Sequence, residues 1–263
     1  MEQPRWVTRE RAVSRRVVFE GRISRVVDYF GGAAPDGGPQ AYLVEQRNHV
    51  LRPHFHPVDQ FQILLGAPGA FFGRRPIDLP VAHYADARTV YGPLTGGDPP
   101  LRYFTLRAEP TQATEFMPES RALLPARPGR SLHREITPAP VDPGAERTGR
   151  TILLADERDG LEISCVTADA GAPVEVPDAG PGGQFLFVLV GEVESGGAGH
   201  LAESIGWQPP GSAGWTGRAA SAGTRLLVLR FPGRAAAGAP PAEPYADADR
   251  RAARVEKGGK HHA

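Results

Sequence analysis

The residues best suited to chemistry are two histidines, His54 and His56, separated by a single phenylalanine. If the chain is extended here, the two-residue period of a strand turns both imidazoles to the same face. Gln60 follows four residues after His56, beyond a turn over residues 57–59. Side chains at the end of one strand and at the start of the next can converge on one point. Two imidazoles and an amide oxygen at that point predict a site for a divalent metal ion.

Further candidates lie on the neighbouring predicted strands. Tyr84, Tyr91 and Tyr103 are candidate catalytic acids, although tyrosines on strands more often pack in the core or at its rim. Arg47 and Arg52 lie on the approach to the histidine pair and are candidates for binding a substrate carboxylate.

Other reaction classes find no support in the sequence. There is no Gly-x-Ser-x-Gly motif for a serine nucleophile, and no glycine-rich loop that ends in Lys-Ser or Lys-Thr for a phosphate. The single cysteine, Cys165, lies in an alternating run without a neighbouring histidine, which indicates a buried small residue rather than a nucleophile.

The elements that must position these residues are strands. The 263 residues include 32 glycines and 27 prolines, which leave little room for helices, while 40% hydrophobic residues suffice for a core. Alternating or short apolar runs bounded by turn residues predict an all-β protein. The predicted strands are Arg16–Glu20, Arg25–Phe30, Ala41–Arg47, Gln60–Leu65, Val81–Tyr84, Arg88–Tyr91, Leu101–Leu106, Arg150–Ala155, Leu161–Ala168, Gln184–Val190, Gly191–Ser195, Ser204–Trp207 and Thr224–Phe231.

The two halves of the chain look alike, which suggests an internal duplication. Gln60–Gly66 and Gln184–Gly191 both open with Gln-Phe, continue with apolar residues and end at a glycine. Many prolines lie between the halves, so we expect a first domain over 1–107, an extended linker over 108–148 and a second domain over 149–233. A disordered tail is expected over 234–263.

Charge and composition exclude several partners. The 30 basic and 30 acidic residues balance, whereas a protein dedicated to nucleic acid usually carries a basic surplus. No apolar run approaches the length of a membrane span, and the N-terminus has no apolar segment of a secretory signal. We therefore expect a cytoplasmic protein that acts on a small molecule, without nucleic acid or membrane as partner.

The motif around the histidine pair resembles the first motif of the cupin superfamily, His-x-His-x3,4-Glu-x6-Gly. Residues 54–60 followed by Gly66 match it, with Gln60 in the position of the glutamate. Residues 184–191 resemble the same motif without its histidines, and residues 203–211 resemble the start of the second cupin motif. The resemblance covers roughly residues 40–107 and 160–232. It implies two tandem jelly-roll β-barrels, a bicupin, joined by the proline-rich linker, and it implies a homodimer.

The resemblance also implies a metal site in the first barrel, with two departures from the family pattern. Gln60 is neutral where the family has a carboxylate, so it would bind a cation more weakly. The family's third histidine would fall near Thr95 and Gly96, where the chain has none; His83 comes earlier and is the candidate fourth ligand. The expected cofactor is one divalent ion per chain, Fe(II) first, with Mn, Ni or Zn as alternatives.

Three functions follow as hypotheses. The first is a metal-dependent cupin enzyme, an oxygenase that acts on a small organic acid, enol or aromatic metabolite in the first barrel. An isomerase or lyase reaction at the same metal is an alternative. The second is a non-catalytic cupin that binds a small metabolite or a protein partner. The third is a metal-free isomerase or cyclase that uses His54 and tyrosines as acid and base. The second barrel lacks the histidines, and its Trp207 and Trp215 indicate a structural role.

Overall fold

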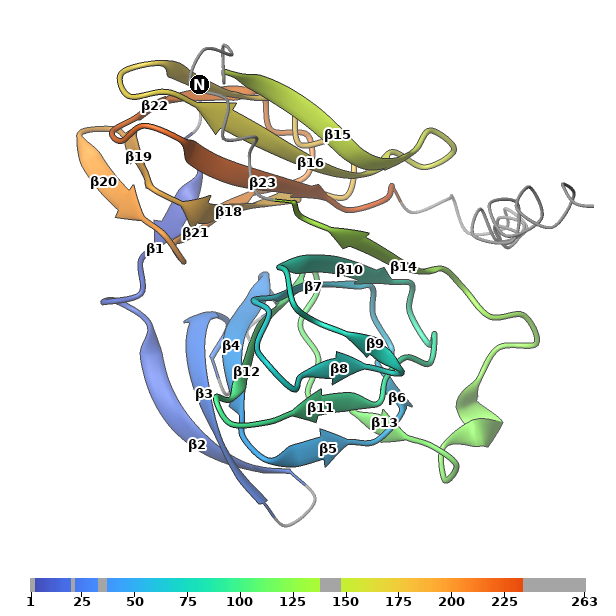
Figure 1. The fold of residues 1–263 in the computed structure, drawn as a ribbon. Helices are drawn as coiled ribbons and strands as arrows, with labels where there is room; N and C mark the ends of the chain where they lie inside the picture. The colour runs from blue at the N-terminus through green and yellow to red at the C-terminus, as the bar shows by residue number, and fades with distance from the viewer. Residues whose placement is uncertain (1–2, 20–21, 33–36, 138–147, 234–263) are drawn as a thin grey trace, which may run out of the picture.

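The computed structural model describes residues 3–19, 22–32, 37–137 and 148–233, and over this part of the chain the protein is almost entirely β-structure. Antiparallel strands form two barrels of jelly-roll type that stack one above the other in Figure 1, so the predicted fold class is confirmed. No helix in the described ranges is long and apolar enough to cross a membrane. The predicted tail, 234–263, lies outside the described residues.

The first barrel is built on a seven-stranded sheet. Its strand order is β14 (Ser131–Glu135), β10 (Val81–Ala85), β7 (Gln60–Leu64), β12 (Leu101–Arg107), β4 (Gln40–Gln46), β3 (Arg22–Phe30) and β2 (Val13–Phe19). A second sheet, in the order β5 (His49–Leu51), β11 (Leu94–Gly96), β8 (Phe71–Phe72) and β9 (Arg75–Pro76), and the pair β13 (Glu115–Phe116) and β6 (His54–Phe55) complete the barrel. Apolar residues from the two larger sheets share its interior, among them Val44, Leu64, Leu51 and Leu94.

The second barrel repeats this plan. Its larger sheet has the order β1 (Arg5–Val7), β21 (Ile205–Gln208), β18 (Gln184–Val190), β23 (Thr224–Arg230), β16 (Leu161–Ala168) and β15 (Gly149–Asp156). Its smaller sheet has the order β17 (Pro173–Val176), β22 (Trp215–Ala219), β19 (Glu192–Ser195) and β20 (Ala198–Leu201). Val188, Trp215 and Val228 lie in the core between these sheets.

The two barrels are packed back to back through their larger sheets. Because side chains alternate along a strand, Phe61 and Ile63 of β7 point out of the first barrel, while Gln60, Gln62 and Leu64 point into it. The outward residues belong to one apolar cluster shared by both barrels. Phe104 meets Phe187 across this junction with ring centroids 4.7 Å apart. The apolar outer face of the second barrel is therefore covered by the first barrel, and the expected homodimer stays a prediction.

The expected domain limits cross several strand pairings. Residues 5–7 of the expected first domain form β1, which pairs with β21 of the second barrel. The expected linker, 108–148, contains β13, a short 3-10 helix (Arg121–Leu123) and β14; its residues 138–147 lie outside the described part of the chain. β14 pairs with β10 along its full length and is the edge of the first barrel's sheet. The prolines of this stretch flank the two strands and none lies within them, so the ladder hydrogen bonds can form.

One predicted strand is wrong. Residues 86–89 form a turn, in which Thr89 donates its backbone N–H to the carbonyl of Asp86 and Arg88 adopts a left-handed φ of 57°, and only Tyr91 of the predicted strand makes a bridge. Asp59 stabilises the same turn by accepting a hydrogen bond from the backbone N–H of Ala87. The turn delivers Tyr91 to the histidine pair, because Tyr91 and His54 exchange backbone hydrogen bonds as an isolated bridge.

Candidate metal and anion site

The histidine pair lies inside the first barrel, where the alternation along the chain predicts it. His54 is in β6 and His56 follows it directly, and their side chains are 2% and 7% exposed. The two imidazole rings meet edge to face with centroids 5.4 Å apart. Phe55 between them is buried in the core. The sequence pattern and the structure therefore bring the same two imidazoles together.

Both imidazoles are oriented by backbone carbonyl groups. Nδ1 of His54 lies 2.8 Å from the carbonyl oxygen of Arg52, and Nδ1 of His56 lies 2.6 Å from that of Ala113. Because a carbonyl oxygen only accepts, each Nδ1 carries the proton and each Nε2 carries the lone pair. Burial, then the charge of Arg107 and the neighbouring His54, hold the pKa of His56 well below its usual range. His56 is therefore neutral at pH 7, as a metal ligand or a proton acceptor must be.

Gln60, at the start of β7, is fixed by a buried arginine. Its Oε1 accepts hydrogen bonds from Nη2 and Nε of Arg107 at 3.0 and 3.2 Å, and its Nε2 donates to the hydroxyl of Tyr91 at 2.6 Å. Arg107 has only donors, so it determines which end of the amide is oxygen. Both ends of the Gln60 amide are thus committed to protein partners.

Arg107 is a site residue that the sequence reasoning missed. It is the last residue of β12, pairs with Gln40 of β4 and is 2% exposed. Its Nη1 donates to Oε1 of Gln40 at 2.7 Å and to the carbonyl of Thr111 at 3.3 Å. The signal was present in the strand alternation, since Tyr103, Thr105 and Arg107 share one face of the strand.

His83 lies in the same interior but has protein partners on both ring nitrogens. Nδ1 lies 2.9 Å from Oε1 of Gln62, and Nε2 lies 3.1 Å from the hydroxyl oxygen of Ser131. Its ring is fully buried, stacks on His133 at 4.5 Å and contacts Tyr91 at 5.1 Å. His83 and His54 contact the same Tyr91 ring, and a metal ion could bind His83 only by displacing Gln62 or Ser131.

Of the three tyrosine candidates, Tyr91 and Tyr103 lie inside the first barrel and Tyr84 lies on its outer face. Tyr91 contacts the His54 ring at 4.5 Å, and its hydroxyl belongs to the Gln60 network. Tyr103 is buried in the interior, where desolvation raises the pKa of its hydroxyl. Tyr84 points to the junction of the barrels instead, where its hydroxyl donates to Asp86. The structure thus brings Tyr91, but not Tyr84, to the histidines.

The two arginine candidates lie outside the interior. Arg47 is exposed and pairs with Asp98. Arg52 donates to the carbonyl of Met117 at 3.1 Å and pairs with Glu119 at 2.9 Å. Both arginines thus pair with acidic side chains.

The partners of Arg52 belong to a segment that covers the site. Residues 111–119, here called the cover segment, supply the carbonyl groups of Thr111 and Ala113 that bind Arg107 and His56. Phe116 of the same segment lies 5.8 Å from the His54 ring. This segment closes the polar end of the barrel, which explains why the histidines are buried.

A cavity of about 540 Å³ opens on another side of the same barrel. It lies between β9 and β14, and its wall includes Phe72 and His133 together with residues of β15. Phe72 contacts the rings of His83 at 4.7 Å and Tyr91 at 6.1 Å. A layer of aromatic rings thus lies between this cavity and His54.

The donor set can be tested against the metal ion that the sequence predicts. The two imidazoles fit it, because both are buried and each turns Nδ1 to a backbone carbonyl, so that Nε2 is the nitrogen that could bind a metal. Gln60 does not, because its oxygen already accepts two hydrogen bonds from a cation. Within the described ranges no group of three or more His, Cys, Asp or Glu side chains is arranged to hold a metal ion. The chain therefore offers two protein ligands, and the other positions would fall to exogenous groups.

The second barrel also has a glutamine at the start of the strand that corresponds to β7. Gln184, at the start of β18, donates to Oε1 of Gln208 at 2.8 Å, as Gln60 bonds its own neighbours in the first barrel. The rings of Trp6 and Trp215 lie 5.8 Å apart in this barrel, and Trp6 stacks on His200 at 4.4 Å. Aromatic rings from β1, β20 and β22 thus pack together in the second barrel.

Comparison with known proteins identifies the fold. No family model matches the chain, and no curated protein matches its sequence. Solved structures do match. Pirin YhhW of Escherichia coli in complex with nickel(II) has a TM-score of 0.53 at 10% identity, over 88% of this chain and 100% of that one. An oxalate decarboxylase mutant of Bacillus subtilis has a TM-score of 0.53 at 9% identity, over 88% and 78%.

A third match is a protein of Nostoc punctiforme whose assignment as a dioxygenase is itself provisional. Its TM-score is 0.54 at 10% identity, over 89% of this chain and 85% of that one. At these identities the likeness concerns the fold alone. The chain therefore has the fold of two tandem cupin barrels.

Proposed function

We propose that the protein is a cupin enzyme whose first barrel binds one divalent metal ion through Nε2 of His54 and His56. The observation that carries this proposal is the pair of contacts from Nδ1 to backbone carbonyls. Such contacts fix the tautomer and the orientation of metal-binding histidines in general. The two imidazoles are also buried side by side, with ring centroids 5.4 Å apart.

A metal ion with two protein ligands keeps open positions for a substrate and, in the case of iron, for dioxygen. We therefore propose an oxygenase reaction on a small organic metabolite, with Fe(II) as the metal. Around that position, Tyr91 offers a hydroxyl proton, the buried Arg107 offers positive charge, and the cover segment excludes water. The cupin fold of the nickel-binding pirin and of the provisional dioxygenase supports this choice.

Metal titration tests the proposal. Protein purified without oxygen should bind one equivalent of Fe(II), Mn(II), Ni(II) or Zn(II) per chain, with a rise in its melting temperature. The double variant His54→Ala/His56→Ala should lose this binding, and the control His49→Ala, a histidine of β5 in the same barrel, should keep it. If the double variant binds as much metal as the wild type, or no metal shifts the wild type, the proposal is wrong.

The oxygenase step has its own test. Nitric oxide replaces dioxygen at iron with an open position and gives a characteristic electron paramagnetic resonance spectrum. Fe(II)-loaded wild type should give this spectrum. Iron bound without it would exclude dioxygen chemistry and leave an isomerase or lyase reaction.

A non-catalytic, metabolite-binding cupin is the second candidate. The commitment of Gln60 to Arg107 and Tyr91 favours it, because the two imidazoles are then left without a third protein ligand to hold a metal tightly. In that case the metal titration fails while small metabolites still bind to the first barrel.

A further inference from the structure

The charge of Arg107 has no counterion among the described residues. Its hydrogen-bond acceptors are the neutral oxygens of Gln60, Gln40 and Thr111, and the ring of Tyr42 lies 5.6 Å from the guanidinium carbon. A buried charge is costly unless an opposite charge compensates it. Arg130, by contrast, is buried among three carboxylates. The first barrel thus holds a cation that the described chain leaves uncompensated.

The donor and the acceptor of each hydrogen bond around Arg107 can also be assigned. Four of the five guanidinium N–H groups have acceptors: that of Nε, both of Nη1 and one of Nη2. Arg107 turns the oxygen of Gln60 toward itself, so the amide nitrogen donates to Tyr91. The Tyr91 oxygen accepts that bond, and its own proton must be donated elsewhere. Among the described residues, one N–H of Arg107 and the O–H of Tyr91 therefore remain without an acceptor.

We infer that this arrangement binds the carboxylate of a small organic acid, with Arg107 as its counterion and the Tyr91 hydroxyl as a second donor. A carboxylate matches the site in charge, because one negative charge balances one guanidinium. It also matches in hydrogen bonding, because it accepts without needing to donate. A neutral alcohol or amide satisfies the donors but leaves the charge uncompensated. A phosphate dianion needs more donors than the two that remain.

This inference rests on the proposed function for the location of the site, and it names the substrate class. It does not require the metal, since Arg107 and Tyr91 lie in the protein itself. A metal ion on His54 and His56 would add positive charge close to Arg107. Metal and acid should therefore each strengthen the binding of the other.

The test uses metal-free full-length protein in chelator. Acetate, pyruvate and malonate are titrated at constant ionic strength, with acetamide as the neutral isostere, and binding is followed by calorimetry and by the melting temperature. We expect at least one of the acids to bind and to raise the melting temperature, and acetamide to do neither. Binding of acetamide as strong as that of the acids, or no binding of any acid, would overturn the inference.

The variant Gln60→Glu places a carboxylate at the position of the atom that Arg107 now binds. The chain then supplies its own counterion, so this variant should fold at least as stably as the wild type and bind acids at least about tenfold more weakly. Tyr91→Phe should weaken acid binding by about tenfold without removing it. Tyr29→Phe is the matched control, because the Tyr29 hydroxyl is buried in the junction of the barrels and has no hydrogen-bond partner among the described residues.

These outcomes separate the two proposals. Acid binding in chelator that Gln60→Glu abolishes supports the inference even if metal titration fails. Equal acid binding in wild type and Gln60→Glu contradicts it even if His54 and His56 bind metal.

Discussion

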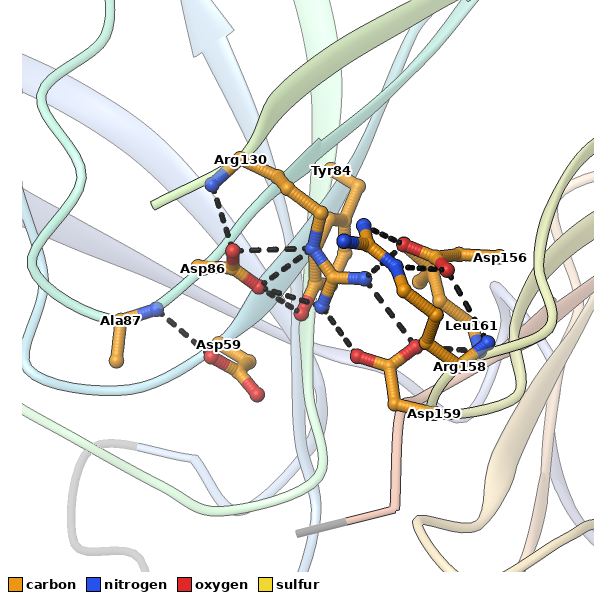
Figure 2. Close-up of polar contacts among 9 residues, drawn as sticks. All are labelled: Asp59, Tyr84, Asp86, Ala87, Arg130, Asp156, Arg158, Asp159 and Leu161. Atoms are coloured by element: carbon orange, nitrogen blue, oxygen red, sulfur yellow. Dashed lines mark hydrogen bonds and ion pairs between the residues drawn. The ribbon is translucent and has the colours of Figure 1, made fainter. Parts of the chain in front are cut away.

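Nη1 of Arg130 lies 2.8 Å from Oδ2 of Asp156, and this contact joins the two barrels (Figure 2). Arg130 immediately precedes β14 of the first barrel, and Asp156 is the last residue of β15 in the second. The same guanidinium binds Asp86 at 2.9 Å and Asp159 at 2.7 Å. Its side chain is 8% exposed. One buried guanidinium thus binds three carboxylates from both sides of the junction.

We predict that Arg130→Met destabilises the protein by about 3–5 kcal/mol, because it removes the partner that Asp86 and Asp159 share and leaves the buried Asp156 with Arg158 alone. The control Arg158→Ala removes another partner of Asp156, but one whose side chain is 43% exposed, and should cost at most about 1 kcal/mol. Urea denaturation measures both free energies of unfolding. Equal losses in the two variants would show that Arg130 has no special role at the junction.

A second prediction concerns pH. Burial, followed by the charges of Arg75 and Arg134, lowers the pKa of His133 to about 4. The folded protein keeps this imidazole neutral while the unfolded chain protonates it near pH 6.5. Its contribution to stability is complete above pH 6.5 and is lost as the pH falls from 6.5 toward 4.

In His133→Gln the free energy of unfolding should therefore depend less on pH over this range. The slopes of variant and wild type should differ by at most the value for one proton, about 1.4 kcal/mol per pH unit. Denaturation at a series of pH values measures the slope. Identical slopes in variant and wild type would mean that His133 is protonated equally easily in both states.

The sequence predicted those features that depend on local periodicity. The alternation of Gln60, Gln62 and Leu64 with Phe61 and Ile63 determines which side chains enter the barrel. The spacing of His54 and His56 brings two imidazoles to one face in the same way. Such patterns are visible in a single strand and need no knowledge of its neighbours.

The features that the sequence did not reveal depend on contacts between distant segments. Nothing near residues 5–7 indicates that they pair with β21 of the second barrel. Arg107 went unnoticed because 28 of the 30 basic residues are arginine, so one more carried little weight. The high proline content of residues 108–148 hid the cover segment, whose role depends on which atoms its carbonyl groups meet.

The cover segment leads to a third prediction. Phe116 packs on His54, and the guanidinium carbon of Arg52 lies 5.1 Å from the centre of the Phe116 ring. Phe116→Ala removes both contacts, so the cover segment should open more often. Loss of about 1 kcal/mol of aromatic contact raises an opening equilibrium by about fivefold. Modification of His54 and His56 by diethyl pyrocarbonate, followed by mass spectrometry, should accelerate by that factor. Phe71→Ala, at an exposed residue of β8, is the control. Equal modification rates in both variants would show that Phe116 does not limit access.

A fourth prediction tests how the N-terminal strand closes the second barrel. Gly206 of β21 pairs with Trp6 of β1, and a Cβ on Gly206 would lie 3.1 Å from the indole ring. Trp6 is also held between His200 and Trp215, so its ring has little room to withdraw.

We therefore expect Gly206→Ala to destabilise the protein by about 1–3 kcal/mol through overpacking, with a change in tryptophan fluorescence. Gly149→Ala, where a Cβ meets open space, should leave the stability within about 0.5 kcal/mol of the wild type. Urea denaturation followed by fluorescence measures both effects. If Gly206→Ala is as stable as Gly149→Ala, the contact of Trp6 with β21 is too loose to close the barrel. A loss confined to Gly206→Ala instead means that residues 5–7 are an integral strand of the second barrel.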